Sequence, residues 1–303
     1  MRVQQFIDHL SNVKRYSPHT LAAYKRDLLQ FLRFCEMKEG ESDFSKITPK
    51  VVRRWLMAEM NGGLRVDLPG KRLCAASGRR KLSSVRAFFR FLVKEGALEV
   101  SPVATVNGPK AARKLPLFLE EEKMDELLDE RLAGSVNFSD LRDRLIVLVL
   151  YDTGIRRSEI IALRVDDVDF ARRVIRVYGK GGKQREVPMI AELVAAIACY
   201  LEMRKEVVEP EHGWLFVTNA GNPVGTSFVY RVTKKYLSEV TTLSRRGPHV
   251  LRHTCATHLL HRDASLQGIK ELLGHSSLAA TQVYTHNSIE HILKIFKQAH
   301  PRA

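Results

Sequence analysis

The sequence predicts a mainly α-helical protein with one small antiparallel sheet, folded as two domains. Three observations support this prediction. The first hundred residues show apolar side chains only at helical spacing. A proline-containing stretch separates them from the rest of the chain, where a single alternating hairpin stands among further helices. At 303 residues the chain is long enough for each domain to bury a core of its own.

Helix start and stop signals order the first domain, which we place at residues 1–105. A Ser-Pro pair at 17–18 opens a helix as N-cap and first-turn residue, and Gly40 ends it. A Thr-Pro pair at 48–49 opens the next helix. A third helix covers about 77–95, with large apolar side chains on one face and basic side chains on the others. These signals predict a helical bundle with a basic side.

Positive charge is concentrated in this first domain. The formal net charge of the chain is +15; residues 1–105 hold 20 Lys and Arg against 10 Asp and Glu, and the remainder holds 29 against 24. Such a distribution predicts a module that grips a polyanion such as DNA, although a basic surface kept only for solubility is the alternative. The candidate DNA-contacting residues on the third helix are Arg79, Arg80, Lys81 and Arg86.

The stretch from 101 to 116 is predicted to be an extended connection between the domains. It contains three prolines, one glycine and several basic residues, with few large apolar side chains. We bound the interdomain linker itself at 106–116. Its charge could follow a phosphate backbone, or it could simply be a solvated linker.

The second domain is predicted at 117–303. A buried helix runs from 140 to 151, and Gly154 breaks it. Residues 174–178 alternate as a strand, and 185–187 return as the second strand of a hairpin. Further helices are expected at about 191–207, 226–239, 249–262, 265–273 and 277–285.

Cysteine spacing and hydropathy predict a reduced protein outside the membrane. The four cysteines lie far apart and form no CxxC pair, so we expect buried thiols rather than disulfides or a zinc ribbon. The longest purely apolar run, 145–151, is too short to cross a bilayer, and the N-terminal segment has no apolar signal-peptide core. We therefore expect a cytoplasmic protein.

Six polar side chains of the second domain could act together on a phosphodiester. Cleavage without a metal requires three things: neutralisation of the developing negative charge, an in-line nucleophile, and a proton for the departing oxygen. Arginine suits the first task because its planar fork binds two phosphate oxygens and keeps its charge. The candidate catalytic residues are Arg156, Lys180, His249, Arg252, His275 and Tyr284.

Their local settings suggest individual tasks. His249 and Arg252 are three apart on one predicted helix and share a face, in a first turn where backbone N–H groups also favour an anion. Lys180 lies in a Gly-rich turn, from which its long side chain could reach a DNA groove and protonate a leaving oxygen. Lys183 is a competitor for that task. Each of these residues taken alone is better explained as an ordinary surface, turn or capping residue.

Tyr284 is the candidate nucleophile. The ordinary pKa of a tyrosine is about 10, so nearby cations must favour its phenolate. Nothing next to Tyr284 distinguishes it from a packing residue; its distance of nine residues from His275 does.

A metal site is the rival interpretation of the same region. Eight of the eleven histidines fall between His249 and His300, with Cys255 among them. However, the spacing of His249, His253 and His258 matches no HExxH or paired Cys/His module. We therefore expect no metal, and we expect Cys255 and His258 to pack inside their helix.

Taken together, these motifs resemble the tyrosine recombinases of the phage integrase family, in particular the XerC/XerD type of site-specific recombinase. The resemblance covers essentially the whole chain. The strings that carry it are SPHTLAAYKRDL and RRKLSSVRAFFRFLVKEG in the first domain, then TGIRRSE, PHVLRHTCATHLL, LGHSS and TQVYTH in the second. It implies a SAM-like four-helix core-binding domain followed by an α+β tyrosine-recombinase catalytic domain.

The resemblance also implies an activity: DNA is cut and rejoined through a 3′-phosphotyrosyl intermediate, without ATP, metal or cofactor. It implies resolution of chromosome dimers at a specific site in double-stranded DNA, by a tetramer that is either homomeric or shared with a second recombinase, and a DNA translocase as a further partner. The alternatives are an integrase of a mobile element, a type IB topoisomerase, and a DNA-binding protein that has lost catalysis.

Two features depart from the family pattern, and a third predicts a terminal helix. Arg157 stands where the family commonly has an aliphatic residue. The stretch 62–76 is longer and richer in Gly and Pro than the usual connection between the core-binding helices. An apolar stripe between Ile289 and Phe296 predicts a terminal helix that docks either on its own domain or, as in similar recombinases, on a neighbouring subunit.

Overall fold

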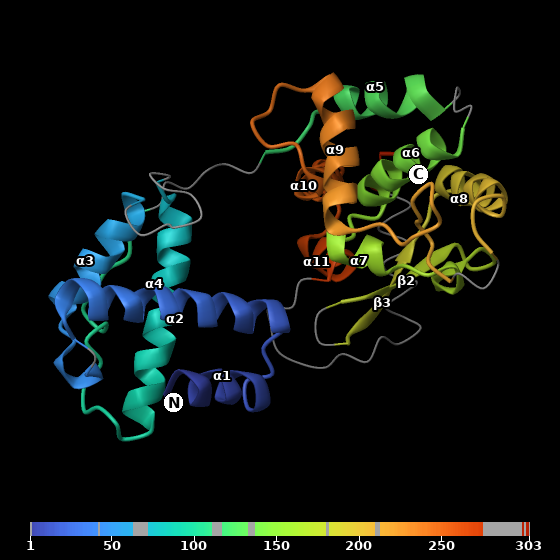
Figure 1. Ribbon diagram of the computed structural model, residues 1–303. Helices are drawn as coiled ribbons and strands as arrows, with labels where there is room; N and C mark the ends of the chain where they lie inside the picture. Colours follow the sequence, from blue (N-terminus) through green and yellow to red (C-terminus); the bar gives the residue numbers. More distant parts are fainter. Residues whose placement is uncertain are drawn as a thin grey trace. The chain divides into compact units, whose positions relative to one another are not determined.

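The computed structural model describes residues 2–41, 43–62, 72–110, 117–132, 137–179, 182–209, 213–274, 299 and 301–302. It divides into two compact units, Met1–Lys114 and Leu115–Ala303, and each has a buried apolar cluster of its own (Figure 1). The predicted fold class, mainly α with a small antiparallel sheet, is confirmed. None of the helices in the described ranges combines the length and the apolar character needed to cross a membrane.

The first unit is a bundle of helices whose ends follow local signals. Ser17 caps the second helix by accepting a hydrogen bond from the Thr20 backbone, and Gly40 ends that helix with a φ of +64°. The amphipathic first helix, absent from our prediction, packs on the second. The described helices are α1 (Arg2–Asn12), α2 (Pro18–Glu39), α3 (Pro49–Met60) and α4 (Ala75–Lys94).

Aromatic side chains fill the core of this unit. Phe31 of α2 meets Trp55 of α3 edge to face, with ring centroids 5.0 Å apart, and both side chains are fully buried. Phe89 of α4 closes the same group. Because helices α2, α3 and α4 each contribute a ring, their packing fixes which side of α4 faces solvent.

The first part of the predicted connection, up to position 110, packs within the first unit, and positions 111–116 lie outside the described residues. Val103 and Val106 are fully buried in the aromatic core, and Arg86 donates a hydrogen bond to the Val106 carbonyl. Composition suggested a linker because the segment is rich in Pro and Gly, but two valines are enough to dock it. The first unit therefore extends beyond position 105.

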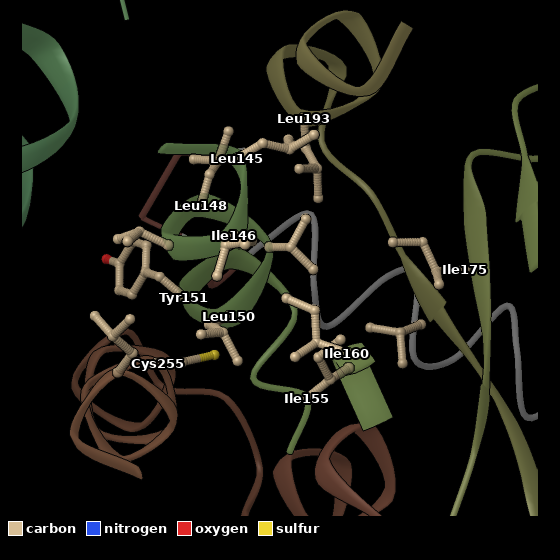
Figure 2. Close-up of a cluster of buried hydrophobic side chains, with 14 of the residues drawn as sticks. Leu145, Ile146, Leu148, Leu150, Tyr151, Ile155, Ile160, Ile175, Leu193 and Cys255 are labelled. Atoms are coloured by element: carbon tan, nitrogen blue, oxygen red, sulfur yellow. The ribbon is translucent and has the colours of Figure 1, made fainter. Parts of the chain in front are cut away.

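The second unit is built around helix α6. Its side chains join those of α7, α8, α10 and β2 in one apolar cluster, in which Ile146, Ile155 and Ile175 are fully buried (Figure 2). The described helices are α5 (Glu121–Leu132), α6 (Phe138–Asp152), α7 (Arg157–Ala162), α8 (Ala191–Arg204), α9 (Thr226–Val240), α10 (Pro248–His261) and α11 (Leu266–Leu273).

A three-stranded antiparallel sheet of order β1-β2-β3 lies beside these helices. Its strands are β1 (Val168–Asp169), β2 (Val174–Tyr178) and β3 (Gln184–Pro188), so the predicted hairpin is confirmed and the two-residue strand β1 is an addition. In the β2–β3 register, Val177 faces Arg185. Since side chains alternate along a strand, Arg185 points to the same buried side as Val187.

All four cysteines are free, but only two are buried. Cys35 and Cys255 lie in the two cores, whereas Cys74, the N-cap of α4, and Cys199 on α8 are exposed. The expectation of buried thiols is therefore wrong for Cys74 and Cys199. Spacing excluded a disulfide framework, but it could not say which side of a helix a thiol occupies.

Candidate active site

Arg156 is positioned by a break between two helices. Helix α6 ends at Asp152, Gly154 turns the chain with a φ of +59°, and Arg156 is the N-cap of α7. The Arg156 guanidinium donates from Nη1 to Glu159 Oε1 at 2.8 Å and from Nη2 to the Gly274 carbonyl at 2.8 Å. About a third of the side chain remains exposed, so the fork can still reach a ligand.

Replacing Gly154 with alanine should destabilise the fold. The positive φ disfavours any side chain, and an added Cβ would lie 2.5 Å from Leu273 Cδ2 and 3.2 Å from Cys255 Sγ. We expect the free energy of unfolding to fall by about 2–3 kcal/mol, measured by urea titration. Gly40→Ala is the matched control: Gly40 has a similar φ but no neighbour within 4 Å, and it should lose about 1 kcal/mol. Equal losses in the two variants would contradict the steric argument.

Arg252 and His249 lie in the first turn and a half of α10, which begins at Pro248, one residue before the predicted start. Arg252 is buried, and its guanidinium donates to the Gly154 carbonyl at 2.6 Å and to the Leu273 carbonyl at 2.7 Å. These two bonds fix the plane of the fork. His249, one turn earlier, is exposed at the surface.

Three arginines converge on the C-terminal end of α11. The carbonyls of Leu272, Leu273 and Gly274 each accept one hydrogen bond from a different guanidinium. Such carbonyls have no partner within their helix and carry partial negative charge, so cations stabilise them. The donors, in the same order, are Arg185, Arg252 and Arg156. His275, the next residue along the chain, lies outside the described residues.

Glu159 joins two of these arginines. Its buried carboxylate accepts from Arg185 through both oxygens, at 3.0 and 2.8 Å, and from the backbone and side chain of Arg156. Burial alone would raise the pKa of Glu159, but the bonds and charge of Arg185, followed by the bonds from Arg156, outweigh it and lower the pKa to about 2. Neither Glu159 nor Arg185 was among our sequence candidates.

Loss of this carboxylate should appear in the pH dependence of stability. The ordinary pKa of a glutamate, 4.5, falls to about 2 in the folded state, so its contribution is complete above pH 4.5 and is lost as the pH falls toward 2. Glu159→Gln should lower the free energy of unfolding by about 3 kcal/mol at pH 7, and the difference from the wild type should shrink below pH 4.5. Urea titrations between pH 7 and pH 3 measure both effects. The control Glu202→Gln removes an exposed partner of Lys205 and should change little; a pH-independent gap would contradict the assignment.

Positive charge accumulates around Arg252. Burial, and then the charge of Arg156, lower the pKa of Arg252 to about 10, so its guanidinium remains charged at neutral pH. Although His249 lies at the surface, partial desolvation of its ring, and then the charge of Arg157, lower its pKa, which favours the neutral imidazole. Cations that lower one another's pKa values are expected to bind an anion.

The histidine and cysteine of α10 have structural partners. His258 is buried, with Nε2 2.8 Å from the Leu119 carbonyl and Nδ1 2.9 Å from the Tyr151 hydroxyl. A carbonyl only accepts, so Nε2 donates and Nδ1 accepts from the tyrosine. Within the described ranges no cluster of His, Cys, Asp and Glu could hold a metal ion. The expectation that Cys255 and His258 pack inside the unit is confirmed.

Of the two predicted lysines and the predicted tyrosine, the structure describes only Lys183. Lys183 is exposed beside β3, and its carbonyl accepts from the Gly179 backbone at 2.7 Å, which closes the hairpin turn. Lys180 and Tyr284 lie outside the described residues, as do the predicted helix at 277–285 and the apolar stripe after it. The structure therefore brings together Arg156, His249 and Arg252 of the six predicted residues.

Two of the predicted DNA-contacting residues of α4 pair with carboxylates of the bundle, and two line a pocket. Lys81 is buried, with Nζ 2.8 Å from Glu59 Oε2, so its interpretation as a DNA contact was wrong: it neutralises a carboxylate inside the bundle. Arg80 is half-exposed and pairs with buried Asp27. Arg79 and Arg86 instead line an open pocket together with Ser83, Gly108 and Lys110, which leaves a cationic surface on this side of α4.

Comparison with known proteins adds independent findings. Residues 118–291 match the phage integrase family, and residues 3–96 match the phage integrase N-terminal SAM-like domain. Tyrosine recombinase XerC of Chlorobaculum tepidum is 36% identical and covers 99% of this chain and 94% of its own length. Tyrosine recombinase XerC of Pelobacter propionicus is 35% identical, with coverage of 100% and 96%.

Two solved structures have a similar fold. XerH site-specific recombinase bound to palindromic difH substrate superposes with a TM-score of 0.71 at 21% identity, covering 96% of this chain and 83% of that one. Tn1549 transposon integrase in complex with transposon right end DNA gives 0.70 at 18% identity, covering 97% and 99%. The fold of this chain is thus shared with these two structures.

Proposed function

Since the chain belongs to the phage integrase family and is a tyrosine recombinase, we propose that it recombines double-stranded DNA at a specific site through a 3′-phosphotyrosyl intermediate. The convergence of Arg156 and Arg252 on neighbouring carbonyls, directly before His275, carries the proposal. Two guanidinium forks held at one place form a centre suited to a phosphate.

Tyr284 is the nucleophile in this proposal. Its phenolic oxygen attacks the phosphorus, the bond to the 5′ oxygen breaks, and the products are a 3′-phosphotyrosyl link and a free 5′-hydroxyl. The 5′-hydroxyl of a partner duplex then attacks this link and releases the tyrosine. Two such exchanges pass through a Holliday junction. Because the phosphotyrosine conserves the bond energy, the cycle requires no ATP, metal or cofactor.

The cations divide the remaining tasks. Arg156 and Arg252 neutralise the charge that develops on the non-bridging oxygens. His249 donates a hydrogen bond to the same phosphate; its lowered pKa favours the neutral imidazole, which keeps one N–H for this bond. His275 supports the phosphate or positions Tyr284, and Lys180 gives the departing 5′ oxygen its proton.

The two hairpin lysines can be told apart by their response to the leaving group. Lys180→Ala should slow cleavage by about 10²–10³-fold, since a general acid contributes on this scale, whereas Lys183→Ala should change it less than about threefold. A substrate with sulfur in place of the scissile 5′ oxygen needs no proton at that position, because a thiol ordinarily has a pKa of about 8.5. This sulfur substrate should restore the cleavage rate of the Lys180→Ala variant. Restoration of the Lys183 variant instead would reverse the assignment.

The first unit is proposed to grip the DNA backbone through the cations that remain fully or partly exposed, Arg79, Arg80 and Arg86, with Lys183 contributing from the second unit. The proposed assembly on DNA is a tetramer, either homomeric or shared with a second recombinase, and a DNA translocase is a further proposed partner. We propose a cytoplasmic protein that resolves chromosome dimers. XerC relatives that match along nearly the whole chain favour this role over that of a mobile-element integrase.

Covalent capture tests the proposal. DNA recovered with the protein from its host is sequenced, and the enriched site is made as a duplex with a nick beside the expected scissile phosphate. A short fragment then leaves after cleavage, and the protein remains linked to a 3′ phosphate. Capture of this site but not of scrambled DNA is expected. Relaxation of random supercoiled plasmid, without site preference, would indicate a type IB topoisomerase instead.

A further inference from the structure

We propose that Arg185 is a positioning residue for strand cleavage, one that holds Arg156 and the end of α11 in their working arrangement. This inference rests on the proposed function, because it concerns the geometry of that same site. Arg185 does not touch the phosphate in this scheme. It acts through Glu159 and through the carbonyl end of α11.

The contacts of Arg185 join three separate segments of the second unit. From β3, its Nε donates to the Leu272 carbonyl at 3.0 Å, and its two Nη atoms donate to the two carboxylate oxygens of Glu159 at 3.0 and 2.8 Å. Glu159 in turn holds both the backbone and the guanidinium of Arg156. One side chain therefore links the β2–β3 hairpin, the start of α7 and the end of α11.

Arg185 occupies an inward strand position that an apolar side chain would ordinarily fill. Its side chain is 95% buried, on the face of β3 that carries fully buried Val187, and opposite fully buried Val177. A buried ion pair is seldom the most stable way to fill such a position, since well-packed apolar residues often do as well or better. The pair Arg185–Glu159 instead supplies directional bonds, which valine or leucine cannot make.

Arg185 also lies close to Gly274, the last residue before His275. A Cβ built on Gly274, which has a φ of +66°, would lie 3.2 Å from Arg185 Cδ and from Arg185 Nη1. Arg185 thus lies on the side of Gly274 where a Cβ would stand, while Arg156 binds the Gly274 carbonyl. Together they fix the exit of the chain from α11, from which His275 follows.

Lysine cannot reproduce this arrangement. Its ammonium is a single point of charge, whereas the planar guanidinium serves Glu159 with two parallel bonds and Leu272 with a third. Arg185→Lys therefore keeps the positive charge but loses the three directional hydrogen bonds to Glu159 and Leu272. Arg142→Lys is the matched control: Arg142 is 4% exposed, lies in the same unit, and binds the Val217 carbonyl and Asn219 away from the arginine cluster.

The test measures single-turnover formation of the covalent complex on the nicked duplex, at saturating protein. Arg185→Lys should be slower than the wild type by about 100-fold, the effect of a misplaced catalytic group, with DNA affinity changed less than about threefold. Arg142→Lys should cleave within about threefold of the wild type. In an Arg156→Lys background, Arg185→Lys should slow cleavage by less than about a further threefold, because both substitutions disturb the same group of interacting residues.

A second variant separates positioning from folding. Glu159→Gln with Arg185→Met removes both buried charges and should keep a cooperative thermal transition, yet cleave at least about 100-fold slower. Wild-type cleavage by this variant, or equal losses in Arg185→Lys and Arg142→Lys, would overturn the inference. Failure of the wild type to capture any enriched site would overturn the proposed function instead.

Discussion

Replacing Tyr284 with phenylalanine should abolish covalent capture of DNA, while affinity for the same duplex stays within about threefold of the wild type. Phenylalanine keeps the ring but has no oxygen to bond to phosphorus. Loss of a covalent nucleophile removes at least about 10⁴-fold of the rate, so no complex should accumulate within hours. Capture on the nicked duplex, followed on denaturing gels, measures the effect.

The controls use the exposed tyrosines of the described part of the second unit, Tyr178 on β2 and Tyr230 on α9, which are 50% and 43% exposed. Tyr178→Phe and Tyr230→Phe should form the covalent complex at the wild-type rate. The nucleotide-bearing peptide of the wild type, identified by mass spectrometry, should contain Tyr284. A linked peptide in the Tyr284→Phe variant would reveal another nucleophile.

Arg252→Lys should reduce the rate of covalent capture by about 10³-fold, the second largest effect we expect. Lysine cannot hold the Gly154 and Leu273 carbonyls and present N–H groups to a phosphate at the same time. Arginines that stabilise the charge of phosphoryl transfer contribute on this scale. Single-turnover cleavage at saturating protein measures the rate, and a urea titration reports any loss of stability.

A neutralised substrate separates these two effects of Arg252. If one non-bridging oxygen of the scissile phosphate is replaced by a methyl group, the phosphate loses its negative charge and needs less compensation. The rate ratio between the wild type and Arg252→Lys should then fall well below 10³, to about tenfold. An unchanged ratio would mean that Arg252 serves only the fold.

Local signals predicted much of the catalytic unit. The break at Gly154, the helix predicted at about 249–262 and the β2–β3 hairpin each depend on a few neighbouring residues. Because such signals are local, the sequence alone was enough to place His249 and Arg252 on one helix face. Local signals could not predict which backbone carbonyls hold the Arg252 side chain in place.

Long-range partners explain what was missed. Glu159 follows Arg156 by three residues, a spacing that could have signalled an ion pair, but its bidentate partner Arg185 is 26 positions away. An arginine at an inward position of a strand is detectable only once the register with β2 is known. Lys81 was misplaced for a related reason, since Glu59 on another helix draws it inward.

The same limitation applies to the segment after α4. Proline and glycine correctly indicated irregular backbone, and irregular backbone suggested a free linker. Docking of Val103 and Val106 depends on apolar side chains from other helices of the same cluster, which no local pattern describes.

The distribution of thiols offers a way to observe this enzyme at work. Exposed Cys74 belongs to the first unit and exposed Cys199 to the second, while Cys35 and Cys255 are shielded in the cores. Hydrogen bonds from Ser77 lower the pKa of Cys74, which favours its reactive thiolate. A pair of fluorescent or spin labels can therefore be attached to the native sequence, one on each unit. A change in the distance between the labels when DNA is added would report whether the two units move relative to one another, without a single engineered residue.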